Sequence, residues 1–184
     1  AQADQLLDPE IADVDGNVES RRNAVSVFNG PEPEIRLFAA EAEEITAIGD
    51  WIKARTEDGV APEEIGVFVR SADEVFRARD AIPAAGLEPT APQPGVDPEP
   101  GRVVLMPMHL AKGLEFRVVV VACCDEDVIP SQQRIEQVTD QSDLEEVYNT
   151  ERHLLYVACT RARDRLLVTA VGEGSEFLGD LRKC

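Results

Sequence analysis

The segment MHLAKGLEF gathers side chains that could bind a ligand, because His109, Lys112 and Glu115 recur every three residues. Gly113 lies among them and allows another group to approach the backbone closely. The apolar run before this segment reaches Pro107, which lacks a backbone donor, so we expect a strand to end there. In open α/β sheets the carboxyl ends of the strands form the ligand-binding edge. The segment is therefore either part of a ligand site or a solvated turn whose charges do no chemistry.

A second segment, ERHLLYVACTRARDRLLVT, places an arginine on the apolar side of a predicted helix. On a helical wheel Leu154, Val157 and Ala158 form an apolar stripe, and Arg161 lies close to its direction. A charge on that side must point into a cleft or find an anion. The alternative is that the helix ends near Thr160 and the arginine favours the negative end of the helix dipole. Periodicity alone leaves both interpretations open.

Other groups give a weaker signal. Asp125, Glu126 and Asp127 follow the most apolar run and could suggest a divalent cation, but adjacent side chains point apart and no distant ligand stands out. A solvated loop is the preferred interpretation. The chain has four cysteines, which are Cys123, Cys124, Cys159 and Cys184. They form no C-x-x-C pair and three lie in apolar runs, which favours core packing over zinc or disulfides. We expect no metal site.

The chain is 184 residues long, enough for one domain with a core, and its formal net charge is −18. An acidic surface excludes generic nucleic-acid binding, which needs clustered lysine and arginine, so any contact with DNA must be local. No apolar run has the length of a membrane span, and no signal-peptide pattern opens the chain. We expect a cytoplasmic protein with no membrane partner.

Strand-like runs alternate with helical periodicity along most of the chain, which predicts a layered α/β domain with a mostly parallel sheet. The expected strands are Val25–Phe28, Ile35–Ala40, Ile65–Val69, Arg102–Met106, Phe116–Cys124 and Arg165–Val171. The expected helices are Glu41–Thr56, one that opens with a capping box at Ser71–Glu74, and Asp143–Ala162.

Two segments interrupt this alternation. Residues 88–101 contain five prolines, so we expect no regular element there and assign 88–102 as a stiff linker within a single domain that covers 1–184. Residues 130–142 are polar and aperiodic, and longer than most connections in a compact domain. We expect this second segment to be a mobile or functional loop.

Taken together, the two chemical segments resemble motifs V and VI of superfamily 1 DNA helicases of the UvrD/Rep type. MHLAKGLEF precedes an apolar strand, and LLYVACTRARDRL follows some tens of residues later, in the order found in that family. The resemblance covers the chain from about Val25 to Val171 and implies the second RecA-like motor domain. It also implies a three-layer RecA-like P-loop NTPase fold with a mostly parallel central sheet but no Walker A loop of its own.

The resemblance implies a role for each residue of the two motifs. His109 and Lys112 would lie on the single-stranded DNA path. Gly113 and Glu115 would lie at the ATP, with the glutamate at the ribose. Arg161 would be the catalytic arginine finger that reaches the γ-phosphate. Such a finger must be a permanently charged planar donor, because it stabilises charge that develops on the transferred phosphoryl group.

The chain departs from the family pattern in places. Pro107 stands where the family usually has threonine, which puts a hydroxyl contact to the DNA backbone in doubt. Thr150 and Glu151 replace the usual acidic pair that opens motif VI, and His153 replaces a common basic residue. The proline-rich linker stands where many relatives insert a large helical subdomain.

No G-x-x-x-x-G-K-[ST] loop occurs in the chain, so ATP with Mg²⁺ would be bound mainly by an N-terminal RecA-like domain of the same protein. The resemblance thus implies an ATP-dependent DNA helicase or translocase with single-stranded DNA and ATP as partners, of which these 184 residues alone would be inactive. The alternative is a degenerate helicase lobe retained as a protein-binding or regulatory module, which the altered threonine and the acidic surface favour.

Overall fold

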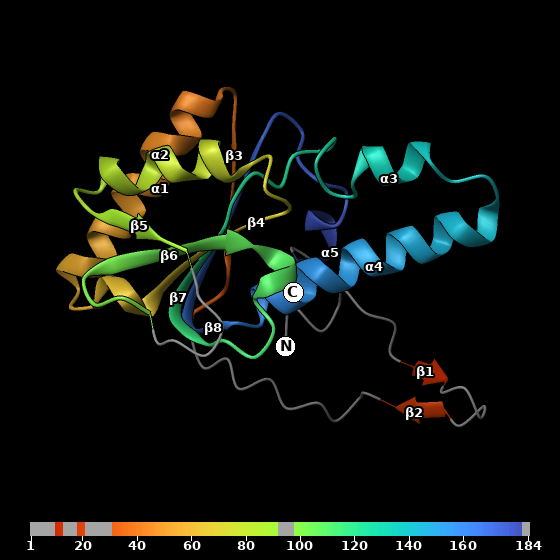
Figure 1. The fold of residues 1–184 in the computed structure, drawn as a ribbon, viewed down its shortest axis with the longest axis horizontal. Coiled ribbons are helices and arrows are strands. Elements are labelled where there is room, and N and C mark those ends of the chain that lie inside the picture. Colours follow the sequence, from red (N-terminus) through yellow and green to blue (C-terminus); the bar gives the residue numbers. More distant parts are fainter. Residues whose placement is uncertain (1–9, 13–17, 21–30, 92–97, 182–184) are drawn as a thin grey trace.

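The computed structural model describes residues 10–12, 18–20, 31–91 and 98–181, and its centre is a six-stranded sheet (Figure 1). Every neighbouring pair in this sheet is parallel, which confirms the predicted α/β class with a mostly parallel sheet. In spatial order the strands are β3 (Glu34–Phe38), β8 (Ala162–Val171), β7 (Phe116–Val121), β4 (Ile65–Val69), β6 (Arg102–Pro107) and β5 (Glu88–Thr90). Two further strands, β1 (Glu10–Ala12) and β2 (Val18–Ser20), form a separate antiparallel pair. The predicted strand Val25–Phe28 lies outside the described residues.

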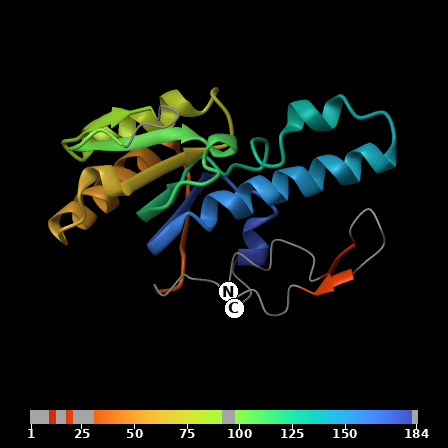
Figure 2. The same ribbon diagram turned by 60° about the horizontal axis from the view of Figure 1, so that its bottom comes forward.

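Helices cover both faces of the sheet, and the sheet separates the hydrophobic core into two clusters. Successive residues of a strand point to opposite faces, so Val67 packs with one core cluster and Phe68 with the other. The cluster of Val67 lies under α1 (Glu41–Glu57) and α2 (Val75–Ala84), and the cluster of Phe68 lies under α4 (Gln141–Cys159). The result is the three-layer arrangement expected for a parallel sheet whose central strands, such as β4, are buried on both faces (Figure 2).

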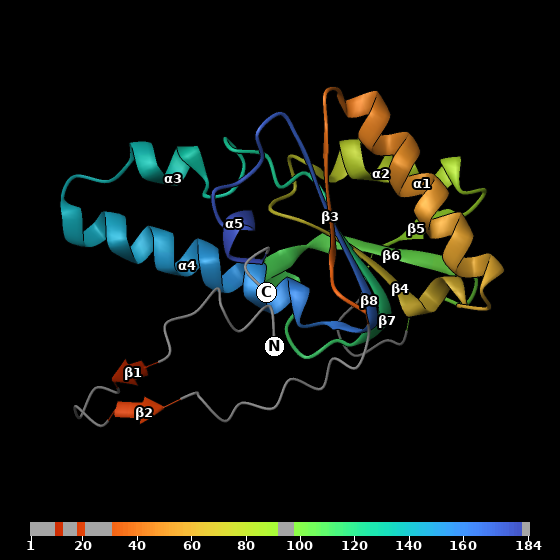
Figure 3. The same cartoon turned by 180° about the vertical axis from the view of Figure 1, so that it is seen from behind.

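The remaining helical segments are short. They are η3 (Pro62–Glu64), η4 (Met108–Leu110), α3 (Gln132–Glu136) and α5 (Leu178–Leu181). Together with α3, the first half of α4 projects beyond the sheet, as the view from behind also shows (Figure 3).

Two predictions about the connecting segments were wrong in part. Glu88–Thr90 forms β5 at the edge of the sheet, although it lies in the stretch assigned as a linker. An edge strand tolerates Pro89 because one side of its backbone needs no sheet partner. The segment 130–142 contains α3, whose short length hides its periodicity.

Helix α4 is offset from its predicted range and buries a different stripe. It runs from Gln141 to Cys159 instead of from Asp143 to Ala162. Its buried residues are Val147, Glu151, Leu155, Ala158 and Cys159, whereas Leu154 and Val157 are half-buried. The buried stripe is therefore shifted by about one residue along the sequence. It includes the carboxylate of Glu151, which the periodicity did not predict to be buried.

The connection from β6 to β7 positions the first chemical segment. It covers only residues 108–115, which we call the crossover loop, and it passes the intervening strand β4 on the α4 side of the sheet. Met108 and Ala111 are buried in the same core cluster as Leu155 and Ala158 of α4. The loop therefore starts at the carboxyl end of β6 and finishes at the amino end of β7.

Candidate functional site

The crossover loop and the junction between α4 and β8 meet at one edge of the sheet. The amide of Phe116 donates to the carbonyl of Arg161 at 2.9 Å, and Phe116 pairs with Ala162 in the sheet register. Glu115 and Arg161 therefore lie side by side, as a shared site requires. They lie at the amino edge, however, and not at the predicted carboxyl edge. They lie at the amino edge because each of these residues directly precedes the first residue of a strand, β7 or β8.

The guanidinium of Arg161 binds the backbone of both segments. Its Nε donates to the carbonyl of Val157 at 3.0 Å and its Nη1 donates to the carbonyl of Leu114 at 3.3 Å. Its Nη2 donates to the Thr160 hydroxyl at 3.4 Å. The bond to Val157, on the last turn of α4, matches the interpretation in which the arginine favours the carboxyl end of the helix. The bond to Leu114 adds a link to the crossover loop that this interpretation does not require.

The other predicted site residues are all exposed along the crossover loop. His109 is in η4 at the carboxyl edge, and Lys112, Gly113 and Glu115 follow toward the amino edge. Gly113 has a φ of +82°. The structure thus brings Glu115 and Arg161 together, and it places His109 toward the opposite edge of the sheet from Arg161. A ligand at His109 and a ligand at Arg161 would contact the same loop from its two ends.

Sequence reasoning missed a buried cluster of charges at the middle of α4. The carboxylate of Glu151 is inaccessible to solvent and accepts hydrogen bonds from Arg70, which directly follows β4. It also accepts from Arg134 Nη1 at 2.9 Å and from the Ser131 amide at 3.3 Å. Burial alone would raise the pKa of Glu151, but the Arg70 and Arg134 charges and the Ser131 amide lower it below its ordinary value. The cluster ties α4 to β4 and α3.

We expect Glu151→Gln to lower the free energy of unfolding by about 2 kcal/mol at neutral pH, because the amide keeps an acceptor but loses the charge. The folded carboxylate has a lowered pKa, so its stabilisation is present above the unfolded value of 4.5 and is lost as the pH falls through the folded pKa. Urea unfolding at a series of pH values should therefore show the difference from wild type shrinking below about pH 4. Glu145→Gln, on an exposed position of the same helix, is the control and should change little. A pH-independent difference would contradict the assignment.

A second cluster corrects the interpretation of Asp125 as part of a solvated loop. Asp125 is largely buried, and both its oxygens accept from Arg77 of α2. Arg77 also binds Glu44 of α1, which is fully buried. Glu126 and Asp127 are exposed as predicted. Among the described residues, no three His, Cys, Asp or Glu side chains are grouped in a way that could hold a metal ion.

The cysteines that the structure describes are core residues, as predicted. Cys123, Cys124 and Cys159 are free and buried. Burial raises the pKa of the Cys159 thiol to about 12, so it stays protonated and unreactive at neutral pH. Cys184 lies outside the described residues.

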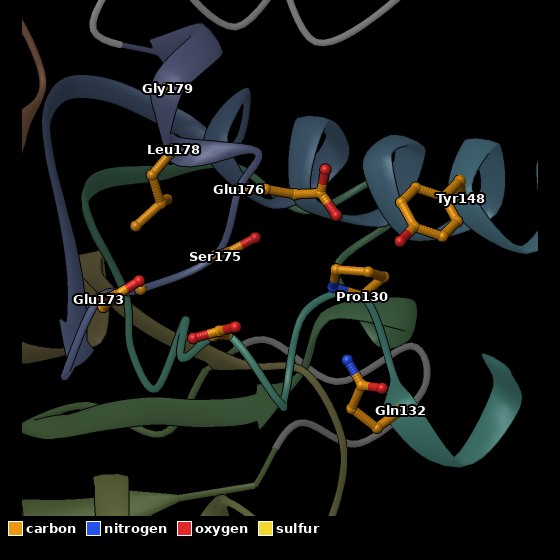
Figure 4. Close-up of a pocket in the computed structure, with 10 residues that line it drawn as sticks. Pro130, Gln132, Tyr148, Glu173, Ser175, Glu176, Leu178 and Gly179 are labelled. Carbon is orange, nitrogen blue, oxygen red and sulfur yellow. The ribbon is translucent and has the colours of Figure 1, made fainter. Parts of the chain in front are cut away.

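A pocket of about 460 Å³ opens at the carboxyl edge, between the segments that follow β7 and β8 (Figure 4). Its lining includes Glu126, Glu173 and Glu176 together with Tyr148 and Ser175, and it contains no Lys, Arg or His. Such a lining repels phosphate groups. The pocket is therefore unsuited to a nucleotide or to DNA, whereas the crossover loop exposes the basic side chains of His109 and Lys112.

Comparison with known proteins gives consistent results. Residues 88–173 match the family model of the UvrD-like helicase C-terminal domain. DNA helicase II of Rickettsia typhi is 36% identical over 84 residues, which are 46% of this chain and 12% of that protein. The ATP-dependent DNA helicase UvrD1 of Mycobacterium tuberculosis is 42% identical over 69 residues, which are 38% of this chain and 8% of that protein. The matched segments thus span about a tenth of the length of these relatives.

A solved structure has the same fold. The C-terminal domain of a possible DNA helicase from Lactobacillus plantarum WCFS1 superimposes with a TM-score of 0.62 at 24% identity, covering 86% of this chain and 87% of that one. This similarity supports the RecA-like three-layer fold. No helix in the described part of the chain has both the length and the apolar character of a membrane span.

Proposed function

We propose, from the match of residues 88–173 to the family model of the UvrD-like helicase C-terminal domain, that the chain is the second motor domain of an ATP-dependent DNA helicase or translocase. The observation that carries the proposal is the direct contact between the two motifs, in which Arg161 binds the Leu114 carbonyl and Phe116 binds the Arg161 carbonyl. A motor lobe must connect a DNA contact with a nucleotide contact, and this junction joins the segments that would make them.

In this proposal Arg161 is the catalytic finger. A guanidinium has five N–H donors, and the hydrogen bonds to Val157, Leu114 and Thr160 use one each at Nε, Nη1 and Nη2. Two donors remain for phosphate oxygens on a neighbouring domain. They are held in a fixed plane by the backbone contacts, which suits the stabilisation of charge that develops on a transferred phosphoryl group.

The other site residues take the roles that their positions allow. Glu115 lies next to Arg161 and is exposed, so its carboxylate can accept hydrogen bonds from a ribose. His109 and Lys112 are exposed along the crossover loop, where they supply local hydrogen-bond donors for a DNA backbone, although the protein as a whole is acidic. ATP with Mg²⁺ would be held mainly by an N-terminal RecA-like domain of the same protein. When bound, Mg²⁺ would neutralise charge on the phosphates, and Arg161 would approach them from this domain.

We expect the 184-residue chain alone to show negligible ATP hydrolysis and weak, salt-sensitive binding to single-stranded DNA, because it has no phosphate-binding loop and a charge of −18. The full-length protein should hydrolyse ATP, and single-stranded DNA should increase its turnover. Steady-state hydrolysis and DNA titration at two salt concentrations measure both. Robust turnover by the isolated chain would contradict the assignment. A folded full-length protein without turnover would instead support the regulatory module, for which the acidic surface is the favouring observation.

A further inference from the structure

The crossover loop makes a tight turn directly before it reaches Arg161. The amide of Leu114 donates to the carbonyl of Ala111 at 3.2 Å, which closes a four-residue turn with Lys112 and Gly113 at its centre. Among the described residues only one non-glycine residue has a positive φ, and it is Cys123, so Lys112 has a negative φ while Gly113 has +82°. This combination is that of a type II turn, which requires a left-handed residue at its third position.

The turn decides where the next carbonyl points. Leu114 follows Gly113 directly, and its carbonyl accepts from Arg161 Nη1 at 3.3 Å. Two residues later the amide of Phe116 donates to the Arg161 carbonyl at 2.9 Å. The crossover loop thus holds the side chain of Arg161, and the first residue of β7 holds its main chain. The orientation of the side-chain contact depends on the backbone at Gly113.

We propose that Gly113 is a positioning residue for Arg161, and not a nucleotide ligand. Its left-handed conformation aims the Leu114 carbonyl at the guanidinium, so that the crossover loop sets the direction of the finger. The Thr160 hydroxyl assists from the other side, because it accepts from Arg161 Nη2 and donates to the Val157 carbonyl at 3.0 Å. The inference rests on the proposed function, since it assumes that Arg161 acts on a nucleotide.

The structure allows this role to be tested without steric interference. A Cβ added at Gly113 would meet no atom within 4 Å, so Gly113→Ala strains only the backbone. Gly113→Asn is the conservative variant, because asparagine tolerates the left-handed region better than other residues with a side chain. Gly86 is the matched control, since it is exposed, has a φ of +78° and also has open space around its Cβ direction. It lies just after α2, on the other side of the sheet from α4.

The experiment compares DNA-stimulated ATP turnover and thermal melting for Gly113→Ala, Gly113→Asn, Gly86→Ala and Arg161→Ala in the full-length protein. We expect Gly113→Ala to lower kcat roughly tenfold to a hundredfold with KM for ATP almost unchanged, because a small misplacement of a catalytic group has effects of that order. Gly113→Asn should keep most of the turnover. Gly86→Ala should lower the melting temperature to a similar extent and leave turnover normal.

Several results would overturn the inference. They are equal turnover in Gly113→Ala and Gly86→Ala, a loss in Gly113→Asn as large as in Gly113→Ala, or a rise in KM in place of a fall in kcat. Normal turnover in Arg161→Ala would instead show that the proposed function itself is wrong.

A second pair of variants covers the case in which Gly113→Ala does not fold. Thr160→Val removes the acceptor for Arg161 Nη2 while keeping the shape of the side chain, and Thr160→Ser restores the hydroxyl. We expect a several-fold loss of kcat in Thr160→Val and near-normal kcat in Thr160→Ser, because a hydroxyl that orients a catalytic donor contributes on the order of one hydrogen bond. Equal turnover in these two variants would contradict the positioning account.

Discussion

Arg161→Ala should reduce the ATP turnover of the full-length protein by roughly a thousandfold or more, while nucleotide affinity changes far less. The reason is that a finger acts on charge that develops at the γ-phosphate in the transition state and contributes little to binding of the ground state. Turnover, ATP affinity and melting temperature measured on one preparation would give the three quantities needed.

The helix-dipole interpretation of Arg161 makes the opposite prediction. If the side chain only caps α4 through the Val157 carbonyl, its loss should lower the melting temperature and leave turnover nearly intact in the protein that remains folded. Near-normal turnover in Arg161→Ala would therefore remove the central residue of the proposed motor.

Two further variants sharpen the Arg161 experiment. Arg161→Lys should rescue poorly, because an ammonium group cannot reproduce the planar fork that binds the Leu114 carbonyl and still presents donors to a phosphate. Arg163→Ala is the matched control, since Arg163 is exposed and donates its hydrogen bonds to the neighbouring carboxylate of Asp164. Its turnover should stay within about twofold of wild type, as expected for an exposed ion pair.

The parts of the fold that sequence alone predicted are those in which one short segment contains the whole signal. Ile65–Val69 is apolar at every position and is buried at every position, and its bounds match the prediction. The helix predicted at Glu41–Thr56 differs by one residue from α1. In both cases local pattern and tertiary packing favour the same structure.

The parts that sequence did not predict depend on the order of the strands in the sheet. The apolar run that ends at Pro107 correctly placed His109 at the carboxyl edge, but nothing in the loop itself shows that eight residues return the chain to the amino end of β7. Placement of Glu115 and Arg161 requires the strand order β7-β4-β6, which is a property of the whole sheet.

The buried charge clusters escaped prediction for a related reason. Glu151 pairs with Arg70 across 81 positions of sequence, and Asp125 pairs with Arg77 across 48. Each of these side chains looks like an ordinary surface charge in its own segment. Only their packing against each other removes them from solvent, so a single sequence carries no local signal for them.

Arg77→Met should destabilise the fold by about 4 kcal/mol, because removing one partner of a buried ion pair leaves an uncompensated charge behind. Arg77 lies between two carboxylates. Its Nε donates to Glu44 Oε2 at 2.7 Å, and its Nη2 donates to Asp125 Oδ1 at 3.1 Å. Burial alone would lower the pKa of the guanidinium, but the hydrogen bond to Asp125 and the charge of Glu44 raise it, so the group stays cationic.

The two carboxylates that Arg77 pairs with also organise the backbone around them. Glu44 Oε1 accepts from the Thr169 hydroxyl at 2.7 Å and from the Cys123 amide at 3.2 Å. Asp125 Oδ1 accepts from the Val171 amide at 2.7 Å. The cluster therefore joins α1, α2 and the ends of β7 and β8, and Cys123 is held within it at a φ of 58°. Loss of Arg77 would leave these bonds in place around two unpaired negative charges.

The expected change in melting temperature for Arg77→Met is about 8–16 °C for a chain of this size, which calorimetry or circular dichroism would detect. Arg79→Met is the control, because Arg79 lies on an exposed position of the same helix and should change stability by less than about 0.5 kcal/mol. Adding Asp125→Asn to Arg77→Met should recover part of the loss, since it removes one of the two stranded charges. If the double variant were less stable than the sum of the single variants predicts, the charge explanation would be wrong and the loss would have to come from packing of the Arg77 side chain.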